Sequence, residues 1–302
     1  GNKSRYFNYD FKENKEKSSL HDNLKLLVES MFKKSKIKVD EIDAIVLATA
    51  TPDYLMPTNA SLLAESFSLK DKPVYQIQAG CSGAIQAIQF ASTLLNDVAY
   101  NNILVLGGDC CNKFLSVDFS KLKQKEIINY LLFGDGVGGV ILSKNRCGSD
   151  YELESIDYRY LGYKLPSAQV VNWSSGLNPS EKFPAIENYK LIEEHVPAIT
   201  ESILNGLLKT KSLKQNDIDY FMLPQLNSNL TKKINKNILQ GDGVKTIDPV
   251  MTASNVGNAM PFVQLSILSK FIKAEERGLL VTVESSNWLG GGLIFNSIGG
   301  LE

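Results

Sequence analysis

An excess of charge of one sign and long apolar runs are both missing from this sequence. Lys and Arg total 32 against 33 Asp and Glu, so the formal net charge is −1, and no overall field favours nucleic acid or an anionic membrane surface. No apolar run reaches the roughly 18–20 residues that a membrane-spanning helix needs, and no signal peptide is visible at the start. We therefore expect a cytoplasmic protein without a nucleic-acid or membrane partner.

Cysteine and histidine are also scarce. Four cysteines in 302 residues are too few for a disulfide framework. No CxxC pair is present, so the usual spacing of a structural zinc site is missing and we expect no metal. The cysteines are Cys81, Cys110, Cys111 and Cys147, and the only histidines are His21 and His195.

Strand-like and helix-like segments alternate along the chain. The predicted helices span residues 18–34, 57–67, 82–95, 185–208, 227–238 and 258–274. The predicted strands span residues 42–48, 74–77, 103–106, 137–142, 218–223, 244–247, 279–284 and 292–297. Residues 160–183 are expected to be irregular. This alternation predicts an α/β architecture.

An internal repeat divides the sequence. Residues 41–47 (EIDAIVL) resemble residues 217–223 (DIDYFML), and residues 103–105 resemble residues 279–281 at the same offset of 176 residues. Chance similarity between apolar runs is the alternative, but two strands at one offset favour duplication. We therefore expect two halves, residues 1–165 and 166–302.

The same offset places Cys81 opposite Gly257, which precedes Asn258. Each position adjoins a predicted helix start, and in a duplicated fold two such starts face each other. Helix N-termini present free N–H groups and the positive end of the helix dipole. We expect a thiolate and an oxyanion to be stabilised there.

Cys81 is the candidate nucleophile. It lies in the small-residue segment Ala79-Gly80-Cys81-Ser82-Gly83, between a predicted strand and a predicted helix. The thiolate is the reactive form of cysteine, and a helix N-terminus lowers the pKa of a thiol. A thioester formed on Cys81 is then open to attack by a second substrate. The alternative for any cysteine is an inert buried side chain, and we assign that role to the other three.

Five segments resemble motifs of ketoacyl-acyl-carrier-protein synthase III, in the thiolase superfamily, and follow in the same order. They are the nucleophile segment 79–83, the upstream stretch 48–57, the glycine-rich turn 133–138, the asparagine segment 255–258 and the glycine loop 290–292. The glycine-rich turn lacks the Gly-Lys-Ser/Thr ending of a phosphate loop. The resemblance implies a duplicated five-layer α/β/α/β/α sandwich, thiolase-like, which agrees with the repeat.

The resemblance also implies roles for individual residues. The backbone N–H groups of Cys81 and Gly291 would form an oxyanion hole. Asn258 would donate to a second thioester carbonyl, with a helix N-cap as the alternative or additional role. Met56 would line an acyl pocket across a dimer interface, with plain core packing as the alternative.

The family further implies substrates and partners. It implies a CoA or phosphopantetheine thioester as substrate, with no permanently bound cofactor. It also implies acyl-CoA or an acyl carrier protein as partner and a homodimer, or a heterodimer with a paralogue.

The sequence departs from the family where a catalytic histidine belongs. Without a gap, Pro224 takes the histidine position, and with a one-residue gap Gln225 takes it. Neither residue is a base, because proline has no ionisable group and glutamine only donates or accepts hydrogen bonds. The two histidines lie outside the family motifs. The chain also begins roughly 30 residues into the family pattern, so the usual opening strand is not visible.

Three functions fit these observations. The first is an acyltransferase of fatty-acid, polyketide or related secondary metabolism, in which Cys81 passes an acyl group from CoA or a carrier protein to an acceptor such as an amine or alcohol. The second is a decarboxylative ketoacyl synthase with Gln225 or water in place of histidine, slowed by about 10²–10⁴-fold. The third is a catalytically silent subunit that supports an active paralogue in a heterodimer, against which the retention of Cys81 and Asn258 counts.

Overall fold

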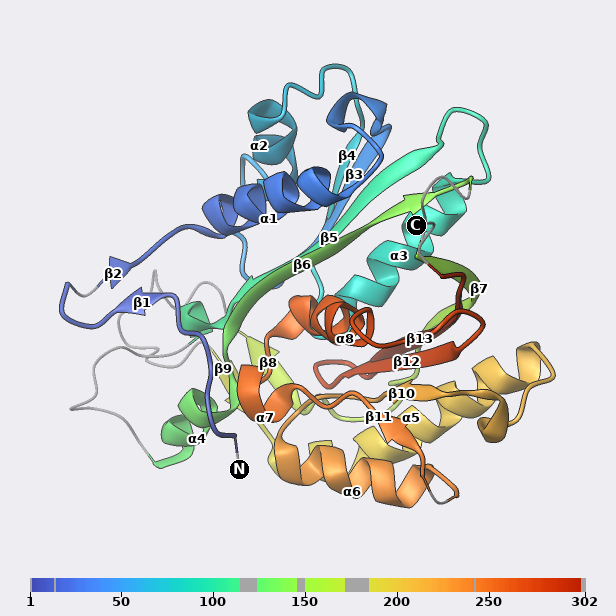
Figure 1. The fold of residues 1–302 in the computed structure, drawn as a ribbon. Helices are drawn as coiled ribbons and strands as arrows, with labels where there is room; N and C mark the ends of the chain where they lie inside the picture. Colours follow the sequence, from blue (N-terminus) through green and yellow to red (C-terminus); the bar gives the residue numbers. More distant parts are fainter. Residues whose placement is uncertain are drawn as a thin grey trace.

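Two mixed β-sheets form the centre of the fold (Figure 1). The computed structural model describes residues 2–13, 15–114, 124–145, 150–171, 185–241 and 243–299, so Cys147 lies outside the described residues. The first sheet has the strand order β4-β3-β5-β6 and the second has the order β11-β10-β12-β13-β7. None of the helices in these ranges is long and apolar enough to cross a membrane.

The first sheet comes from the N-terminal part of the chain. Its strands are β3 (Ala44–Ala48), β4 (Val74–Ile77), β5 (Asn102–Cys110) and β6 (Asp135–Ser143). The second sheet consists of β7 (Tyr151–Tyr160), β10 (Tyr220–Met222), β11 (Lys245–Thr246), β12 (Arg277–Glu284) and β13 (Leu289–Ser297). Two small hairpins accompany them, β1 (Tyr9–Asp10) with β2 (Lys15–Glu16), and β8 (Gln169–Val171) with β9 (Ala185–Glu187).

Helices lie in three layers around the two sheets. They are α1 (Leu20–Lys34), α2 (Asn59–Ser66), α3 (Gly83–Leu94), α4 (Gln124–Leu132), α5 (Tyr189–Thr210), α6 (Ser228–Ile238), α7 (Val250–Ala253) and α8 (Met260–Leu268), with the short 3₁₀ helices η1 (Val39–Glu41), η2 (Cys111–Phe114), η5 (Gln215–Asp217) and η6 (Gly257–Ala259). The predicted helix 258–274 is therefore a 3₁₀ turn followed by a shorter α-helix, while the predicted strand 74–77 is observed with those bounds.

Packing of apolar side chains assigns each helix to a layer. On the outer face of the first sheet, Leu20 and Leu24 of α1 and Leu63 of α2 pack with β3 and β5. Between the sheets, α3 and α8 pack on both, as the shared cluster of Ala84, Phe262 and strand residues shows. Helices α5 and α6 cover the outer face of the second sheet. The result is the predicted five-layer α/β/α/β/α sandwich.

The two sheets share one connection pattern. Strand β3 pairs in parallel with β4 and β5, and β10 pairs in parallel with β11 and β12. The central strands β5 and β12 then pair antiparallel with β6 and β13. Ala44 and Tyr220, which open β3 and β10, are 176 residues apart, so the repeat seen in the sequence corresponds to equivalent strands.

Strand β7 has no counterpart in the described part of the first sheet. It lies before residue 165 in the chain, yet it pairs with β13 of the second sheet. The second sheet thus begins earlier in the sequence than the predicted boundary at residue 165, and the boundary itself stays a prediction.

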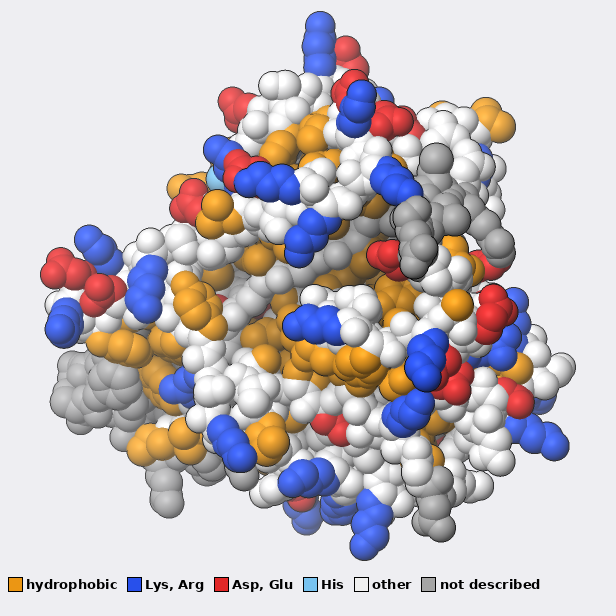
Figure 2. All heavy atoms as spheres, in the orientation of Figure 1, with side chains coloured by type: hydrophobic (Ala, Val, Ile, Leu, Met, Phe, Trp, Pro, Cys, Tyr) orange, Lys and Arg blue, Asp and Glu red, His pale blue; other side chains and the backbone are white. Residues whose placement is uncertain are grey.

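The surface carries charges of both signs. Figure 2 shows cationic and anionic side chains interspersed over one face, with apolar side chains visible around α8. This mixture agrees with the net charge of −1.

Candidate active site

Cys81 lies in the turn between β4 and α3, as the sequence predicts. Gly83 N donates to Gly80 O (2.9 Å), which closes the turn. A Cβ at Gly83 would lie 2.5 Å from Asn258 Oδ1, so glycine is required for the close approach of the second half. The small residues around Cys81 therefore bring its thiol to the junction between the two halves.

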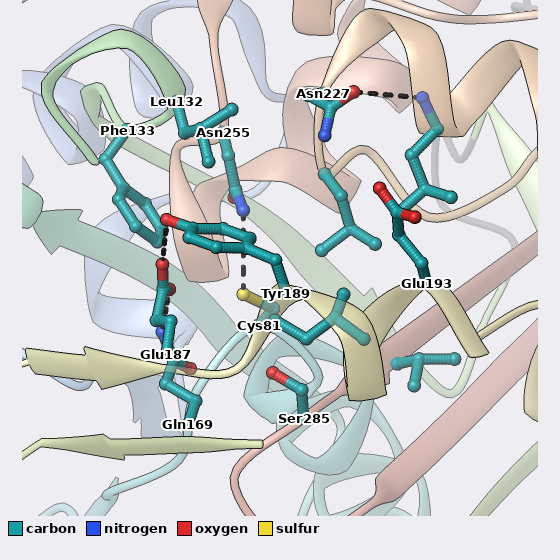
Figure 3. A pocket seen from close by; sticks show the side chains of 14 residues that line it. Cys81, Leu132, Phe133, Gln169, Glu187, Tyr189, Glu193, Asn227, Asn255 and Ser285 are labelled. Carbon is teal, nitrogen blue, oxygen red and sulfur yellow. Dashed lines mark hydrogen bonds between the residues drawn. The ribbon is translucent and has the colours of Figure 1, made fainter. Parts of the chain in front are cut away.

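A pocket opens at the Cys81 side chain, with a cavity volume of about 40 Å³ (Figure 3). Its walls come from α4, the β8–β9 hairpin, α5, the segment before α6, the asparagine segment and the end of β12. The labelled lining residues are Cys81, Leu132, Phe133, Gln169, Glu187, Tyr189, Glu193, Asn227, Asn255 and Ser285. A second cavity of about 20 Å³ shares Cys81 and Asn255 and reaches Pro224 and Gln225.

Cys81 is held as a neutral thiol. Burial raises the pKa of Cys81 to about 12, and the carboxylates of Glu284, Asp109 and Glu187 add to the rise, while a hydrogen bond from Asn255 opposes it. A helix N-terminus stabilises an anion by about 0.3–1 kcal/mol, which is less than one pKa unit. The sequence-based expectation that α3 would lower the pKa of this thiol is therefore wrong, because burial outweighs the helix dipole.

Two asparagines near the start of η6 have different contacts. Asn255 Nδ2 points at Cys81 Sγ over 4.0 Å, as Figure 3 shows. Asn258 Nδ2 instead donates to Ala79 O (2.9 Å) and Asp109 Oδ2 (2.9 Å), and Asn258 is fully buried. Asn258 does not line either pocket at Cys81. Its predicted role at a thioester carbonyl stays a prediction, and Asn255 is the amide in contact with the sulfur.

Asp109, at the end of β5, holds the second half against the first. Its Oδ2 accepts from Asn258 N (2.7 Å) and Nδ2. Its Oδ1 accepts from Ala50 N (2.7 Å) and from the hydroxyls of Thr49 and Thr51 (both 3.2 Å). Burial raises the pKa of Asp109 to about 6, and these hydrogen bonds oppose the rise. This carboxyl is a structural link rather than a group that faces the pocket.

Glu284, at the end of β12, makes the reciprocal contact. Its Oε2 accepts from Gly80 N (3.0 Å) in the turn that carries Cys81, and its Oε1 accepts from the Ser286 hydroxyl. The central strand of each sheet thus ends in a carboxylate that accepts a backbone N–H group from the turn of the other half. Glu284 was not predicted, since nothing in its local sequence marks this contact.

The position of the missing histidine has no base. Gln225 Nε2 donates to Asp248 Oδ1 (2.9 Å) and Leu223 O (3.0 Å), and Gln225 Oε1 accepts from Val250 N (3.1 Å). The Gln225 amide is therefore occupied by protein groups. Pro224 and Gln225 both line the smaller cavity beside Cys81, so the structure places this position near the thiol, as the sequence comparison implies.

The two histidines lie away from the pocket walls. The His195 ring packs edge-on against Trp288 with 5.0 Å between ring centroids. His21 Nε2 lies 3.1 Å from Ser66 Oγ. Neither residue lines the two cavities at Cys81.

Gly291 and Met56 also lie outside the pocket walls. Gly291 is inside β13, paired with Thr282 and Tyr158 of the flanking strands. The glycine segment 290–292 is therefore a strand and not a loop. Met56 is 86% exposed in the single chain. The predicted oxyanion role of Gly291 and the predicted acyl-pocket role of Met56 stay predictions.

The remaining described cysteines are buried and free. Burial raises the pKa of Cys110 to about 12 and raises that of Cys111 well above its ordinary value. Among the described residues, no group of three His, Cys, Asp or Glu side chains is placed to hold a metal ion.

A hydrogen-bonded cluster around the Glu187 carboxylate forms one wall of the pocket, and it was not predicted from the sequence. Glu187 Oε1 accepts from Gln169 Nε2 (2.7 Å), and Glu187 Oε2 accepts from the Tyr189 hydroxyl. The Tyr189 hydroxyl also contacts Asn129 Oδ1 of α4. Burial raises the pKa of Glu187, although its two hydrogen-bond donors oppose the rise.

The five-layer duplicated sandwich and the cysteine at the junction of its halves define a protein of the thiolase superfamily. The family profile of 3-oxoacyl-[acyl-carrier-protein] synthase III matches residues 75–158. The solved structure of AbyA1, a tetronic acid condensing enzyme, is similar with a TM-score of 0.90 and 30% identity, covering 97% of this chain and 87% of that chain. The chain is a ketoacyl-acyl-carrier-protein synthase III-like protein of the thiolase superfamily.

Curated relatives agree. Beta-ketoacyl-[acyl-carrier-protein] synthase III of Streptococcus gordonii is 30% identical over 220 residues, which are 69% of this chain and 62% of the relative. The enzyme of the same name from Rickettsia bellii is 30% identical over 214 residues, 70% of this chain and 64% of the relative. The chain thus spans less than two thirds of the length of these relatives. The solved structure of 3-oxoacyl-(acyl carrier protein) synthase III from Pseudomonas aeruginosa has the same fold, with a TM-score of 0.81. It is 15% identical, and the match covers 94% of this chain and 85% of that chain.

Proposed function

We propose that this protein is an acyltransferase that accepts an acyl group from a CoA or carrier-protein thioester onto Cys81 and passes it to an acceptor. The observation that carries the proposal is the place of Cys81, at a helix start and in a pocket to which both halves contribute. Membership in the ketoacyl synthase III family supports it, because that family name denotes enzymes that act on acyl groups of a carrier protein. The acyl donors are substrates, and no permanently bound cofactor is part of the proposal.

An oxygen or nitrogen acceptor suits this pocket better than a malonyl group. Decarboxylative condensation in the family relies on a histidine and an asparagine, yet Pro224 or Gln225 takes the histidine position. The amide of Asn258 is bound to Ala79 and Asp109. Acyl transfer to a hydroxyl or an amine forms no enolate and needs neither group. AbyA1 is a tetronic acid condensing enzyme, and a tetronic acid is a cyclic ester, so acyl transfer to oxygen is part of making one.

A dimer is part of the proposal. Tyr54, Leu55 and Met56 form a run of apolar side chains that are 59%, 56% and 86% exposed. Apolar side chains exposed side by side are typical of a surface that a second subunit covers. A homodimer is the simpler assembly, with a paralogue as the second subunit in the alternative. Sedimentation of the purified chain distinguishes the homodimer from a monomer, and sedimentation after co-expression with a paralogue tests the heterodimer.

Intact-mass spectrometry tests the acyl-transfer proposal. We expect wild-type protein incubated with acyl-CoA and acyl-carrier-protein donors to gain the mass of one acyl group, and Cys81→Ala to gain none. Cys110→Ala is the matched control, since Cys110 is a buried thiol outside the pocket, and it should acylate as the wild type does. A wild type that gains no Cys81-dependent mass from any donor contradicts the proposal and favours the silent-subunit alternative.

A second measurement separates transfer from condensation. Malonyl-carrier protein is added to the acylated enzyme, and release of CO2 is followed beside transfer to small alcohols and amines. We expect deacylation by the alcohols or amines and little CO2. Rapid CO2 release would establish the decarboxylative alternative instead.

A further inference from the structure

The Cys81 thiol is almost entirely protonated at neutral pH. Because the pKa of Cys81 is raised to about 12, a fraction of roughly 10⁻⁵ of the thiol is ionised at pH 7. The thiolate is the form that attacks a thioester. A neighbouring group that takes the proton during the attack is therefore needed for a useful rate.

Of the described residues that line the pocket with Cys81, two carry carboxylates, Glu187 and Glu193, and none is a histidine. The Glu193 side chain is exposed and no hydrogen bond holds it among the described contacts. Glu187 is partly buried on the short strand β9. It contributes to the electrostatic field at Cys81. Figure 3 shows both side chains around the same space, with Glu187 on the wall formed by the β8–β9 hairpin.

The Glu187 carboxylate is held from two other elements. Gln169 Nε2 of β8 donates to its Oε1 at 2.7 Å. The Tyr189 hydroxyl, at the first residue of α5, contacts its Oε2. These contacts fix the orientation of the carboxylate in the pocket wall. A cavity of about 40 Å³ exceeds the ~10–15 Å³ that one water needs, so one water can join Glu187 to Sγ where they do not touch directly.

The same cluster can take up a proton without losing a contact. The Tyr189 hydroxyl has one proton but contacts two acceptors, Glu187 Oε2 and Asn129 Oδ1. When Glu187 is ionised, Tyr189 donates to it. When Glu187 is protonated, it donates to the phenolic oxygen and Tyr189 donates to Asn129. The protonated state therefore satisfies every contact of the cluster, while in the ionised state the Asn129 amide has to rotate so that its Nδ2 donates to the phenolic oxygen.

We propose that Glu187 is the proton-transfer group for Cys81, in place of the histidine that this sequence lacks. The proposal rests on the acyl-transfer function proposed above. The Glu187 carboxylate takes the Sγ proton while Sγ attacks the carbonyl carbon of the donor thioester. The new bond joins Sγ to the acyl carbon, the bond from that carbon to the donor sulfur breaks, and protonated Glu187 returns the proton to the departing thiolate. The products are the acyl-enzyme and the free donor thiol, with no oxidant or reductant involved.

Other titratable groups lie near Cys81. Tyr189 and Glu193 of α5 line the pocket, and the carboxylates of Glu284 and Asp109 raise the pKa of Cys81 without lining the pocket. Burial raises the pKa of Tyr189 well above its ordinary value, so it stays protonated through the neutral range. Asp109 also has a raised pKa, but its hydrogen bonds join the two halves and it does not line the pocket. Glu187 lines the pocket, is oriented by hydrogen bonds, and has a pKa raised by burial.

Glu187→Gln is the decisive variant. An amide at this position keeps the contacts, since its oxygen accepts from Gln169 and its NH₂ group donates to the Tyr189 oxygen while Tyr189 donates to Asn129. It removes the ability to accept a proton together with the negative charge, and the second readout below separates these two effects. Glu194→Gln, on an exposed residue of α5 outside the pocket, is the matched control. Glu187→Asp tests rescue, because it restores a carboxylate with a shorter reach.

The first readout is the rate of Cys81 acylation, followed by intact mass against pH. We expect Glu187→Gln to acylate about 10²–10⁴-fold more slowly at pH 7, Glu187→Asp to be intermediate, and Glu194→Gln to match the wild type. The wild-type rate should rise with pH through the pKa of Glu187 and then level off. The glutamine variant should instead rise about tenfold per pH unit up to high pH, because only spontaneous ionisation of the thiol remains. The two should converge at high pH.

The second readout is alkylation of Cys81 by iodoacetamide, which needs no acyl donor. We expect a nearly pH-independent rate for the wild type between pH 7 and 9 and a rate that rises with pH for Glu187→Gln. If Glu187 acts only through its negative charge, its removal eases ionisation of the thiol. The variant would then react faster than the wild type with the same pH slope, and that result overturns the proposal. Absence of acylation in the wild type overturns the proposed function instead, while alkylation still decides the role of Glu187.

Discussion

Cys81 and Gly257 occupy equivalent places in the two halves, 176 residues apart, but only the first position can carry a side chain. Cys81 precedes α3 in a turn that leaves its thiol in a pocket. Gly257 opens η6 with a φ of +55°, and a Cβ there would lie 2.2 Å from Asp109 Oδ2. The two turns are thus built alike but differ in what they present: the first places a thiol in a pocket, and the second is closed by a carboxylate of the first half.

The carboxylates at the ends of β5 and β12 also have different roles in the two halves. Asp109 accepts five hydrogen bonds and is fully occupied in joining the halves. Glu284 accepts the Gly80 N–H group of the Cys81 turn, and its charge adds to the raised pKa of the thiol. The two halves therefore share one backbone arrangement, and the proposed active site lies on one side because the side chains at equivalent positions differ.

Asn258→Asp should break the hydrogen-bonded link between the halves, and we expect it to cause the largest loss of stability. It places a carboxylate oxygen where an amide donates to Asp109 Oδ2 at 2.9 Å and to Ala79 O. Two donated hydrogen bonds are lost in a buried site and two carboxyl groups face each other, so the free energy of unfolding should fall by about 4–6 kcal/mol. Urea denaturation at pH 8 measures it, with the exposed substitution Asn96→Asp as control.

The loss of unfolding free energy in Asn258→Asp should depend on pH. The folded variant holds a proton between its paired carboxyls at a pKa above the value of about 6 in the wild type, whereas unfolded carboxyls titrate near ~4. The folded state then binds more protons than the unfolded state, so stability relative to wild type should increase as the pH is lowered from 8 toward 5. A deficit that is the same at both pH values would show that charge repulsion is not its cause.

Gly257→Ala tests the difference between the two turns themselves. The positive φ costs about 1 kcal/mol for a residue with a Cβ, and overlap with Asp109 adds about 1–3 kcal/mol. We expect the free energy of unfolding to fall by about 2–4 kcal/mol in urea denaturation.

Gly206→Ala is the matched control for that variant. It lies inside α5, and its Cβ would meet only the end of the Arg159 side chain at 3.0 Å. Alanine in a helix interior is favoured over glycine by about 0.5–1 kcal/mol, so the control should be neutral or slightly stabilising. Equal losses from both substitutions would mean that the Gly257 turn has no special constraint.

Most of the fold could be predicted from the sequence, because its strands and helices follow local patterns of apolar residues. Apolar strands and amphipathic helices at one repeat offset predicted two similar α/β halves, the family resemblance implied the five layers, and small residues around Cys81 predicted its turn. Strand β7 was missed since Glu152, Glu154 and Asp157 make it resemble a solvated loop. In the structure its Glu154 pairs with Arg277 at 2.8 Å, a partner 123 residues away that no local pattern could supply.

The site was less predictable because its groups meet only in the folded chain. Glu187 lies on a strand of three residues, Ala185–Glu187, too short to show a period and directly before a strongly helical segment. The raised pKa of Cys81 likewise depends on carboxylates from distant residues and on burial. The helix dipole alone therefore predicted a lowered pKa for Cys81, whereas the pKa is raised. Asn255 was within a recognised motif, but the motif alone did not say which of its two asparagines faces the sulfur.

Asn255→Asp tests which of the two asparagines acts on the Cys81 sulfur, and we expect it to have the smallest effect of these variants. The substituted oxygen keeps the acceptor for Gly257 N (3.0 Å), but it replaces the amide that points at Cys81 Sγ with a negative oxygen. The pKa of the thiol should rise by about one unit. In the Glu187→Gln background, where only the ionised thiol reacts, alkylation by iodoacetamide at pH 9 should therefore slow about tenfold, with little change in urea stability. The same chemical change at Asn258 should do the opposite, with a large loss of stability. If Asn255→Asp unfolds the protein instead, both asparagines join the halves and neither serves the thiol.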